Sequence, residues 1–302
     1  MDAGHFVERH GADLVRLWAS SIDYTDDVPF SEEMFTRLGD TYRRIRNTLR
    51  ILLGNLFDYP SGKQESRKAG FNLVDRWILE RLDQVIRDCR SAYELFEFHK
   101  VYHTLNQFCA VDLSSLYIDI TKDRMYCDAP DSPRRRATQM VMHRVFDALC
   151  RLLAPILAFT AEEAWRHLGV GASVHLEEFP QAQHRRHEAS DQVAKLLTLR
   201  GAIGQAIERA RQEKLIGNAL EAAIVLHSTS DVTTKIDKEE LEEFFIVSDL
   251  TIHEANEATA CVTKTPYRKC ARCWRHRSSV GASKEHPDLC DRCESVVTKV
   301  VG

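Results

Sequence analysis

The sequence predicts a mainly α-helical fold that leads into two smaller C-terminal modules. Apolar residues recur every three or four positions up to residue 188, which is the period of amphipathic helices. After residue 222 the period shortens to that of β-strands, and two Cys-x-x-Cys pairs follow near the end of the chain. We therefore expect a linker segment at 1–30, a helical bundle at 31–188, a long helix with a small α/β module at 189–260, and a cysteine-based module at 261–302.

The predicted bundle begins with a helix after residue 31. Ser31 is a good N-cap, two acidic residues follow it, and an apolar stripe continues to Leu56. Further helices are expected at about 74–89, 96–120, 133–152 and 192–215. Pro155 should end the third of these, and the residues Thr-Ala-Glu-Glu at 160–163 fit a capping box that starts another helix. Short strands are then expected at 222–226, 250–253 and 261–263, around an acidic helix at 237–245.

The formal charge of −4 conceals two basic regions. Residues 41–57 contain four arginines and no acid, and residues 261–302 contain nine Lys or Arg against four Asp or Glu. On the first predicted helix, Arg43, Arg46, Asn47 and Arg50 are spaced i, i+3, i+4 and i+7, so they share one face. Guanidinium groups at this spacing suit successive phosphates or bases of a nucleic acid. The alternative is a solvated helix face and an ordinary basic tail.

Four of the nine cysteines have the spacing of a metal site. Cys270 and Cys273 form one Cys-x-x-Cys pair, and Cys290 and Cys293 form a second one sixteen residues later. Each pair directs two sulfurs to one ion, so the two pairs complete a tetrahedron around one structural Zn²⁺. The polar loop between them cannot form its own core, so the metal must supply folding energy. Nearby cations that could offset the thiolate charge are Lys269, Arg272, Arg275 and Arg292. A redox pair or unrelated thiols are the alternatives.

The search for catalytic residues is negative. Four thiolates leave no open position on the metal for water, so we expect no catalysis there. The sequence contains no glycine-rich phosphate loop, no nucleophile elbow and no dinucleotide-binding fingerprint. His99 and His103 are spaced for a metal, but Lys100 stands where a hydrolytic zinc helix carries Glu. We expect no catalytic residue, no membrane span, no membrane partner and, without an export signal, a cytoplasmic location.

Several motifs, in order along the chain, resemble one family. They are GADLVRLW at 11–18, YRRIRNTLR at 42–50, LGNL at 53–56, DRW at 75–77, FHKVY at 98–102, DLSS at 112–115, YCD at 126–128, LAPI at 153–156, FTAEEAW at 159–165, EKLIG at 213–217 and KCARCWR at 269–275. Over essentially its whole length the chain resembles the C-terminal half of bacterial isoleucyl-tRNA synthetase, a class I aminoacyl-tRNA synthetase. The bundle alone would also suit the valyl and leucyl relatives, whereas the terminal cysteine pairs with Trp274 look specifically isoleucyl.

The resemblance implies a tRNA-binding role. In the family, the helical bundle binds the anticodon stem and loop of tRNA(Ile), and the zinc module helps to hold the anticodon end. Carried onto this sequence, the expected tRNA-binding residues are Arg43, Arg46, Asn47, Arg50, Lys269, Arg272, Trp274 and Arg275. Trp274 suits stacking on an unpaired base, and its alternative is a ring packed on the zinc core.

The resemblance also implies what this sequence lacks. The family binds ATP through a His-Ile-Gly-His type element and a Lys-Met-Ser-Lys-Ser loop, and neither occurs here, so the chain has no ATP site. By itself it should not activate isoleucine. The resemblance places the start of the sequence just downstream of the catalytic domain, which leaves open an internal start at Met1 or a separately encoded catalytic N-terminal half as a partner. The alternatives are a stand-alone, non-catalytic tRNA-binding paralogue or partner subunit, and a helical zinc scaffold without an RNA ligand.

Overall fold

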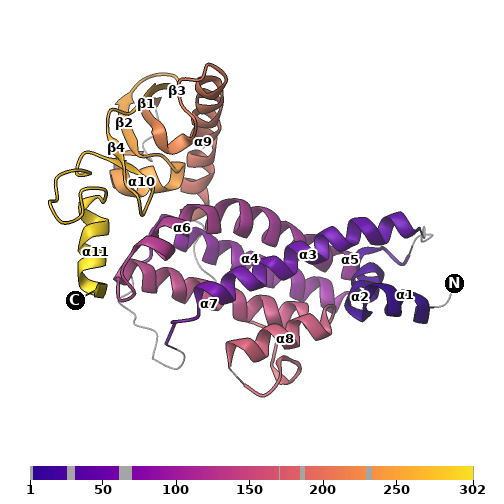
Figure 1. Ribbon diagram of the computed structural model, residues 1–302. Helices are drawn as coiled ribbons and strands as arrows, with labels where there is room; N and C mark the ends of the chain where they lie inside the picture. The colour runs from indigo at the N-terminus through magenta and orange to yellow at the C-terminus, as the bar shows by residue number, and fades with distance from the viewer. Residues whose placement is uncertain are drawn as a thin grey trace. The chain divides into compact units, whose positions relative to one another are not determined.

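A computed structural model describes residues 3–25, 31–60, 70–169, 171–183, 188–228 and 233–301 (Figure 1). The chain forms two compact units. The first comprises Met1–Ala69, Ile78–Asp119 and Arg136–Arg186, and the second comprises Gly70–Trp77, Ile120–Arg135 and His187–Gly302. The predicted fold class, mainly helical with a small mixed sheet and a C-terminal four-cysteine cluster, is confirmed. The predicted division into four parts stays a prediction.

Helices build the first unit. They are α1 (Ala3–His10), α2 (Ala12–Ser21), α3 (Glu32–Asn55), α4 (Leu73–Glu94), α5 (Phe98–Gln107), α7 (Pro133–Leu153) and α8 (Ala158–Leu168), of which α4 and α7 extend into the second unit. Residues predicted as a linker therefore contain two helices, and α2 packs against both α3 and α5. In the described ranges, no helix combines the length and hydropathy needed to cross a bilayer.

The helix α3 forms as its sequence predicts. The Ser31 hydroxyl accepts a hydrogen bond from the backbone N–H of Met34 and caps the helix. The apolar stripe is buried, including Leu38, Ile45 and Leu52. Because this stripe fixes the rotation of the helix, residues 43, 46, 47 and 50 are left on an exposed flank.

One predicted helix, 96–120, has a more complex form. The structure has α5, then a π-helical segment (Phe108–Tyr117), then α6 (Ile118–Cys127). In the π segment the hydroxyls of Ser114 and Ser115 donate to the carbonyls of Cys109 and Ala110, five residues earlier. The apolar period alone does not distinguish such a segment from an α-helix, so the sequence predicts one uninterrupted helix there.

The predicted capping box at 160–163 is wrong. Thr160 lies inside α8, and a carboxylate from another helix caps this turn. Asp13 of α2 accepts hydrogen bonds from the backbone N–H of Phe159 (3.2 Å) and Thr160 (2.7 Å), and from the Thr160 hydroxyl. The acceptor comes from far away in the sequence, so no local pattern could reveal it.

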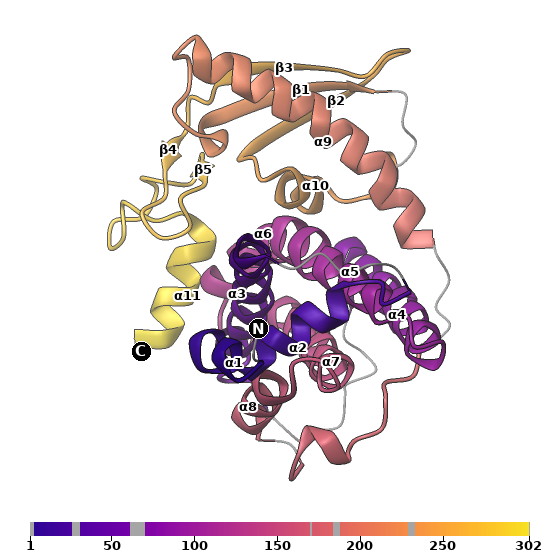
Figure 2. The same ribbon diagram turned by 90° about the vertical axis from the view of Figure 1, so that its right-hand side faces the viewer.

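A three-stranded sheet lies in the second unit. Its strands β1 (Ala222–Ser228), β2 (Asp249–Glu254) and β3 (Thr259–Lys264) have the order β2-β1-β3, with β1 parallel to β2 and antiparallel to β3. Alternate residues of β1 are buried. The long helix α9 (Glu188–Gln212) packs along β3 and β1, and α10 (Lys238–Phe245) packs against β2 (Figure 2). Short 3₁₀ turns lie at Val174–Leu176, Ala219–Glu221 and Thr233–Lys235.

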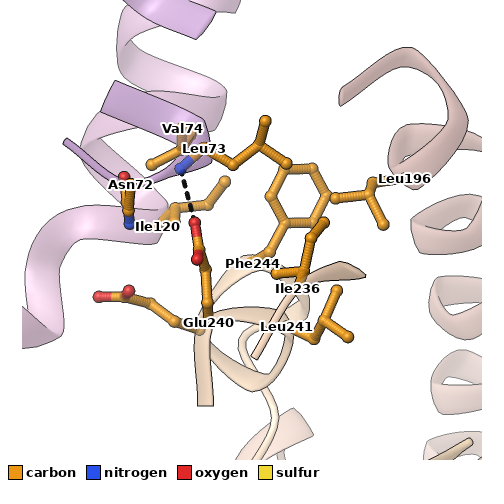
Figure 3. A pocket seen from close by; sticks show the side chains of 10 residues that line it. Asn72, Leu73, Val74, Ile120, Leu196, Ile236, Glu240, Leu241 and Phe244 are labelled. Atoms are coloured by element: carbon orange, nitrogen blue, oxygen red, sulfur yellow. Dashed lines mark hydrogen bonds between the residues drawn. The ribbon is translucent and has the colours of Figure 1, made fainter. Parts of the chain in front are cut away.

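The helix α10 also contacts those parts of α4 and α6 that belong to the second unit. Glu240 accepts a hydrogen bond of 2.6 Å from the backbone N–H of Leu73 at the start of α4, and Phe244 lies with Leu196 in the apolar surroundings of this contact (Figure 3). Nearby, the buried Arg124 of α6 donates both to Asp75 of α4 and to Glu243 of α10. Removing one member of this buried triad would leave an uncompensated charge and strongly destabilise the packing of the three helices.

Candidate metal centre and nucleic-acid interface

The four cysteines of the two Cys-x-x-Cys pairs converge on one point. The Sγ atoms of Cys270, Cys273, Cys290 and Cys293 all lie within 4.8 Å of one another. Zn–S bonds of about 2.3 Å in a tetrahedron would separate neighbouring sulfurs by about 3.8 Å, and the Cys273 and Cys290 Sγ atoms are 3.8 Å apart. The cluster is therefore consistent with a zinc site. Among the described residues no other group of three His, Cys, Asp or Glu side chains has such geometry.

Local backbone structure brings the sulfurs together. The strands β4 (Arg268–Lys269) and β5 (His276–Arg277) pair on either side of the first cysteine pair, and the N–H of Cys270 donates to the carbonyl of Arg275 (2.9 Å). The turn requires a left-handed backbone at Trp274, where φ is 65°. The second cysteine pair lies at the start of α11 (Asp291–Val301). A few apolar side chains, including Val280 and Leu289, complete this small core.

Hydrogen bonds to the sulfurs favour thiolates. The backbone N–H of Cys290 donates to the Sγ of Cys270 (3.3 Å), and the Arg272 guanidinium donates to the Sγ of Cys293 (3.7 Å). Hydrogen bonds from Cys273 and Cys290, with a further one from Arg272, lower the pKa of Cys293, whereas hydrogen bonds with Cys273 and Cys293 raise the pKa of Cys290. The site thus suits a metal ion that prefers thiolate ligands. Its four sulfurs would occupy all four positions around that ion.

The arginine row on α3, which we define as Arg43, Arg46, Asn47 and Arg50, lies at the surface as predicted. Arg43 pairs with Asp40 on the same helix. The Arg46 guanidinium lies 3.1 Å from the Glu163 carboxylate, and both side chains are 55% exposed. Asn47 and Arg50 have no hydrogen-bond or ion-pair partner among the described residues. Whether these side chains contact tRNA stays a prediction.

Two predicted tRNA-binding residues beside the four-cysteine cluster are also exposed. Trp274 is 62% exposed, and the Lys269 ammonium lies 5.2 Å from the centre of its ring. The apolar cluster around the cysteines does not include this ring. The exposed position favours stacking with an external group over packing on the metal core.

The other two predicted contacts, Arg272 and Arg275, are paired with groups of the protein itself. The Arg275 side chain is 7% exposed, and its guanidinium lies 3.8 Å from both Asp123 and Glu242. Arg272 donates to the carbonyl of Cys127 at the end of α6. Either guanidinium would have to break these interactions to contact tRNA. That Arg272 and Arg275 bind tRNA stays a prediction.

Asp123 and Glu242, the acids that pair with Arg275, are not among the predicted site residues, and neither is the buried Arg124. A charged residue within an apolar stripe is the sequence signal that indicates a buried ion pair. Arg124 follows the buried Ile120 by four residues, so it lies on the core side of its helix and requires a buried acidic partner. The weaker candidate at His99 and His103 gathers no metal-ligand set among the described residues, and His99 lies 3.9 Å from Asp23.

Comparison with known proteins agrees with this arrangement. Residues 75–226 match the model of the anticodon-binding domain of tRNA ligase, and residues 269–296 match the zinc finger found in FPG and IleRS. The first match covers half of the chain, so the chain belongs to the family of tRNA ligase anticodon-binding domains.

Over nearly its whole length, the chain is similar to isoleucine–tRNA ligases. The ligase of Methylacidiphilum infernorum is 41% identical and that of Symbiobacterium thermophilum 40% identical, each over 98% of this chain. The ligase of Syntrophomonas wolfei is 39% identical over 100% of the chain. The matches cover 33%, 34% and 35% of those relatives, so the chain spans about a third of their length. The predicted resemblance to the isoleucyl-tRNA synthetase family is confirmed.

Proposed function

We propose that this chain is the tRNA-binding portion of an isoleucine–tRNA ligase. It binds the anticodon stem and loop of tRNA(Ile) and supports the ATP-dependent isoleucylation of that tRNA during protein synthesis in the cytoplasm. The observation that carries the proposal is that one chain matches both the anticodon-binding domain and the zinc finger found in IleRS. The chain itself has no ATP site, and alone it does not activate isoleucine.

The arginine row supplies the positive face for the RNA backbone. Arg43, Arg46 and Arg50 are exposed along one flank of α3, so their guanidinium groups can bind successive phosphates. The acidic partners of Arg43 and Arg46 are at the surface, and exchanging an exposed carboxylate for a phosphate costs little.

Trp274 and Lys269 supply a second contact. An exposed indole stacks on an unpaired base, and the adjacent ammonium neutralises a phosphate. One structural Zn²⁺ would be held by Cys270, Cys273, Cys290 and Cys293, and it would supply folding energy to the module that presents this pair. The side chains of this chain, and not the metal ion, would contact the tRNA.

Two measurements test the proposal. The purified chain should bind tRNA(Ile) more tightly than unrelated tRNAs, and its affinity should fall steeply with salt. In an ATP–pyrophosphate exchange assay, the chain alone should give no exchange, and a separately expressed catalytic half should give exchange. Equal binding of all tRNAs would contradict the isoleucine assignment. Selective binding without any increase in aminoacylation by the catalytic half would instead favour a stand-alone tRNA-binding protein.

A further inference from the structure

Four arginines of the cysteine-containing module (residues 261–302) contact residues in other parts of the second unit. Arg275 is buried, and Arg272, Arg277 and Arg292 are half-buried. Arg272 donates to the carbonyl of Cys127 and lies 3.5 Å from that of Tyr126. Arg292 donates through both terminal nitrogens to the carboxylate of Asp123, with one contact of 2.8 Å. Asp123, Tyr126 and Cys127 all belong to α6.

The remaining two arginines meet on one carboxylate of α10. Arg277 lies 2.9 Å and Arg275 lies 3.8 Å from Glu242, whose side chain is 2% exposed. Arg275 also lies 3.8 Å from Asp123, so it joins the two acids. A buried carboxylate without a partner is costly, and these guanidinium groups therefore hold the module against α6 and α10.

The two acids respond differently to this environment. Burial raises the pKa of Glu242 above its ordinary value despite the charges of Arg277 and Lys238. Although burial acts to raise it, the pKa of Asp123 lies below its ordinary value because of the hydrogen bonds from Arg292 and the charge of Arg275. Asp123 therefore carries its negative charge at neutral pH.

We propose that Arg272, Arg275, Arg277 and Arg292 form an intramolecular lock, which joins the metal-binding module to α6 and α10 and is not part of the RNA-contacting surface. In this lock, Arg272 and Arg292 are positioning residues that couple the metal site to the end of α6.

Arg272 provides the coupling because one guanidinium serves two acceptors. Its Nη1 lies 3.7 Å from the Sγ of Cys293 and also donates to the carbonyl of Cys127. A thiolate and a helix C-terminus both carry partial or full negative charge, so a single cation stabilises both at once. Loss of the Arg272 side chain should weaken metal binding by Cys293 and, at the same time, destabilise the last turn of α6.

The first test uses the full zinc-loaded chain and needs no RNA. The rate of zinc transfer to a colorimetric chelator is measured for Arg272→Ala and Arg292→Ala, and hydrogen exchange is followed at 118–128. Lys284→Ala, an exposed cation of the same module, is the matched control. Removing groups that support metal ligands costs about 10-fold to 100-fold in metal affinity. Arg272→Ala, which removes the donor to the Cys293 Sγ, should therefore release zinc at least about 10-fold faster, and Arg292→Ala should also release it faster than the parent. Exchange at 118–128 should rise in both, and the control should behave as the parent.

A double-mutant cycle covers the case in which a single variant folds poorly. Asp123→Asn, Arg292→Gln and the double variant are compared by zinc release. If the two side chains act as one pair, the double variant should be no worse than either single one. Additive effects, or zinc release unchanged in all three, would overturn the lock.

A third measurement separates the lock from the RNA surface, and this part rests on the proposed function. A phosphate contact contributes about 0.7 to the salt slope of binding to single-stranded RNA. Arg272→Ala should leave the slope for tRNA(Ile) unchanged even if affinity falls. A slope reduced by about 0.7, with zinc release and hydrogen exchange unchanged, would make Arg272 an RNA contact and overturn the inference. Failure of the parent chain to bind tRNA would contradict the proposed function and leave the zinc and exchange results valid.

Discussion

The two basic regions look alike in the sequence but differ in what their arginines contact. On α3, the acids that pair with the arginine row are themselves at the surface: Asp40 is 63% and Glu163 is 55% exposed. In the metal-binding module, the partners Asp123 and Glu242 are 15% and 2% exposed. From local charge density alone, both basic regions are predicted to contact a nucleic acid. The burial of the partner decides which arginines are available to an external ligand and which ones hold the fold together.

The difference follows from the elements that carry the arginines. The core stripe of α3 leaves the arginine row on a flank where, within the described ranges, no other element supplies a buried acid. The metal-binding module has only a few apolar side chains of its own, so it depends on the metal and on charged contacts with α6 and α10. Exposed ion pairs contribute about 0–1 kcal/mol, whereas breaking a buried pair costs about 3–5 kcal/mol.

Removing the metal should have the largest effect, and it should affect only one of the two regions. Structural zinc contributes about 10–16 kcal/mol to folding in small zinc-finger peptides. Chelation should therefore abolish hydrogen-exchange protection at 269–296 and reduce it at the end of α6, while α3 keeps its protection. A module that stays fully protected after complete chelation would show that its fold does not require the metal.

Reversing the charge of the arginine row should have the next largest effect. Arg43→Glu, Arg46→Glu and Arg50→Glu in one chain should lower the affinity for tRNA(Ile) by at least about 10-fold at low salt and reduce the salt slope by about 0.7 per lost contact. Thermal stability should change little because these side chains are exposed.

Arg37→Glu is the matched control for the arginine row. Arg37 is an exposed arginine on the same helix, but it lies on the other flank. It should leave both tRNA affinity and the salt slope nearly unchanged. An equal loss in the control would mean that the overall charge of α3, and not this row, determines binding.

Trp274 should give a smaller effect that is specific to RNA. Base stacking on an aromatic ring is worth about 1–3 kcal/mol, so Trp274→Ala should weaken tRNA binding by that amount and Trp274→Phe by less. Zinc release should be unchanged, because the ring is exposed and lies outside the apolar cluster. Faster zinc release without weaker tRNA binding would favour the alternative of a ring packed on the metal core.

Local patterns in the sequence predicted the elements better than they predicted the partners of side chains. The Ser31 cap, the stripe of α3 and the cysteine spacing are short-range signals, and the structure has all three. The cap of α8 depends on Asp13, and the direction of Arg275 depends on Asp123 and Glu242. These contacts join residues far apart in the chain, so they are set by the packing of the helices.

The surface pair of Arg46 and Glu163 should give the smallest effect and completes the comparison. In a double-mutant cycle with Arg46→Ala and Glu163→Ala, the coupling in the free energy of unfolding should be about 0–1 kcal/mol, because both side chains are 55% exposed and screened by water and salt. The measurement is urea denaturation at two salt concentrations. The same arginine must still contribute to tRNA affinity. A coupling of about 3–5 kcal/mol, as expected when a buried pair is broken, would mean that Arg46 also stabilises the fold, and the contrast between the two regions would then not hold.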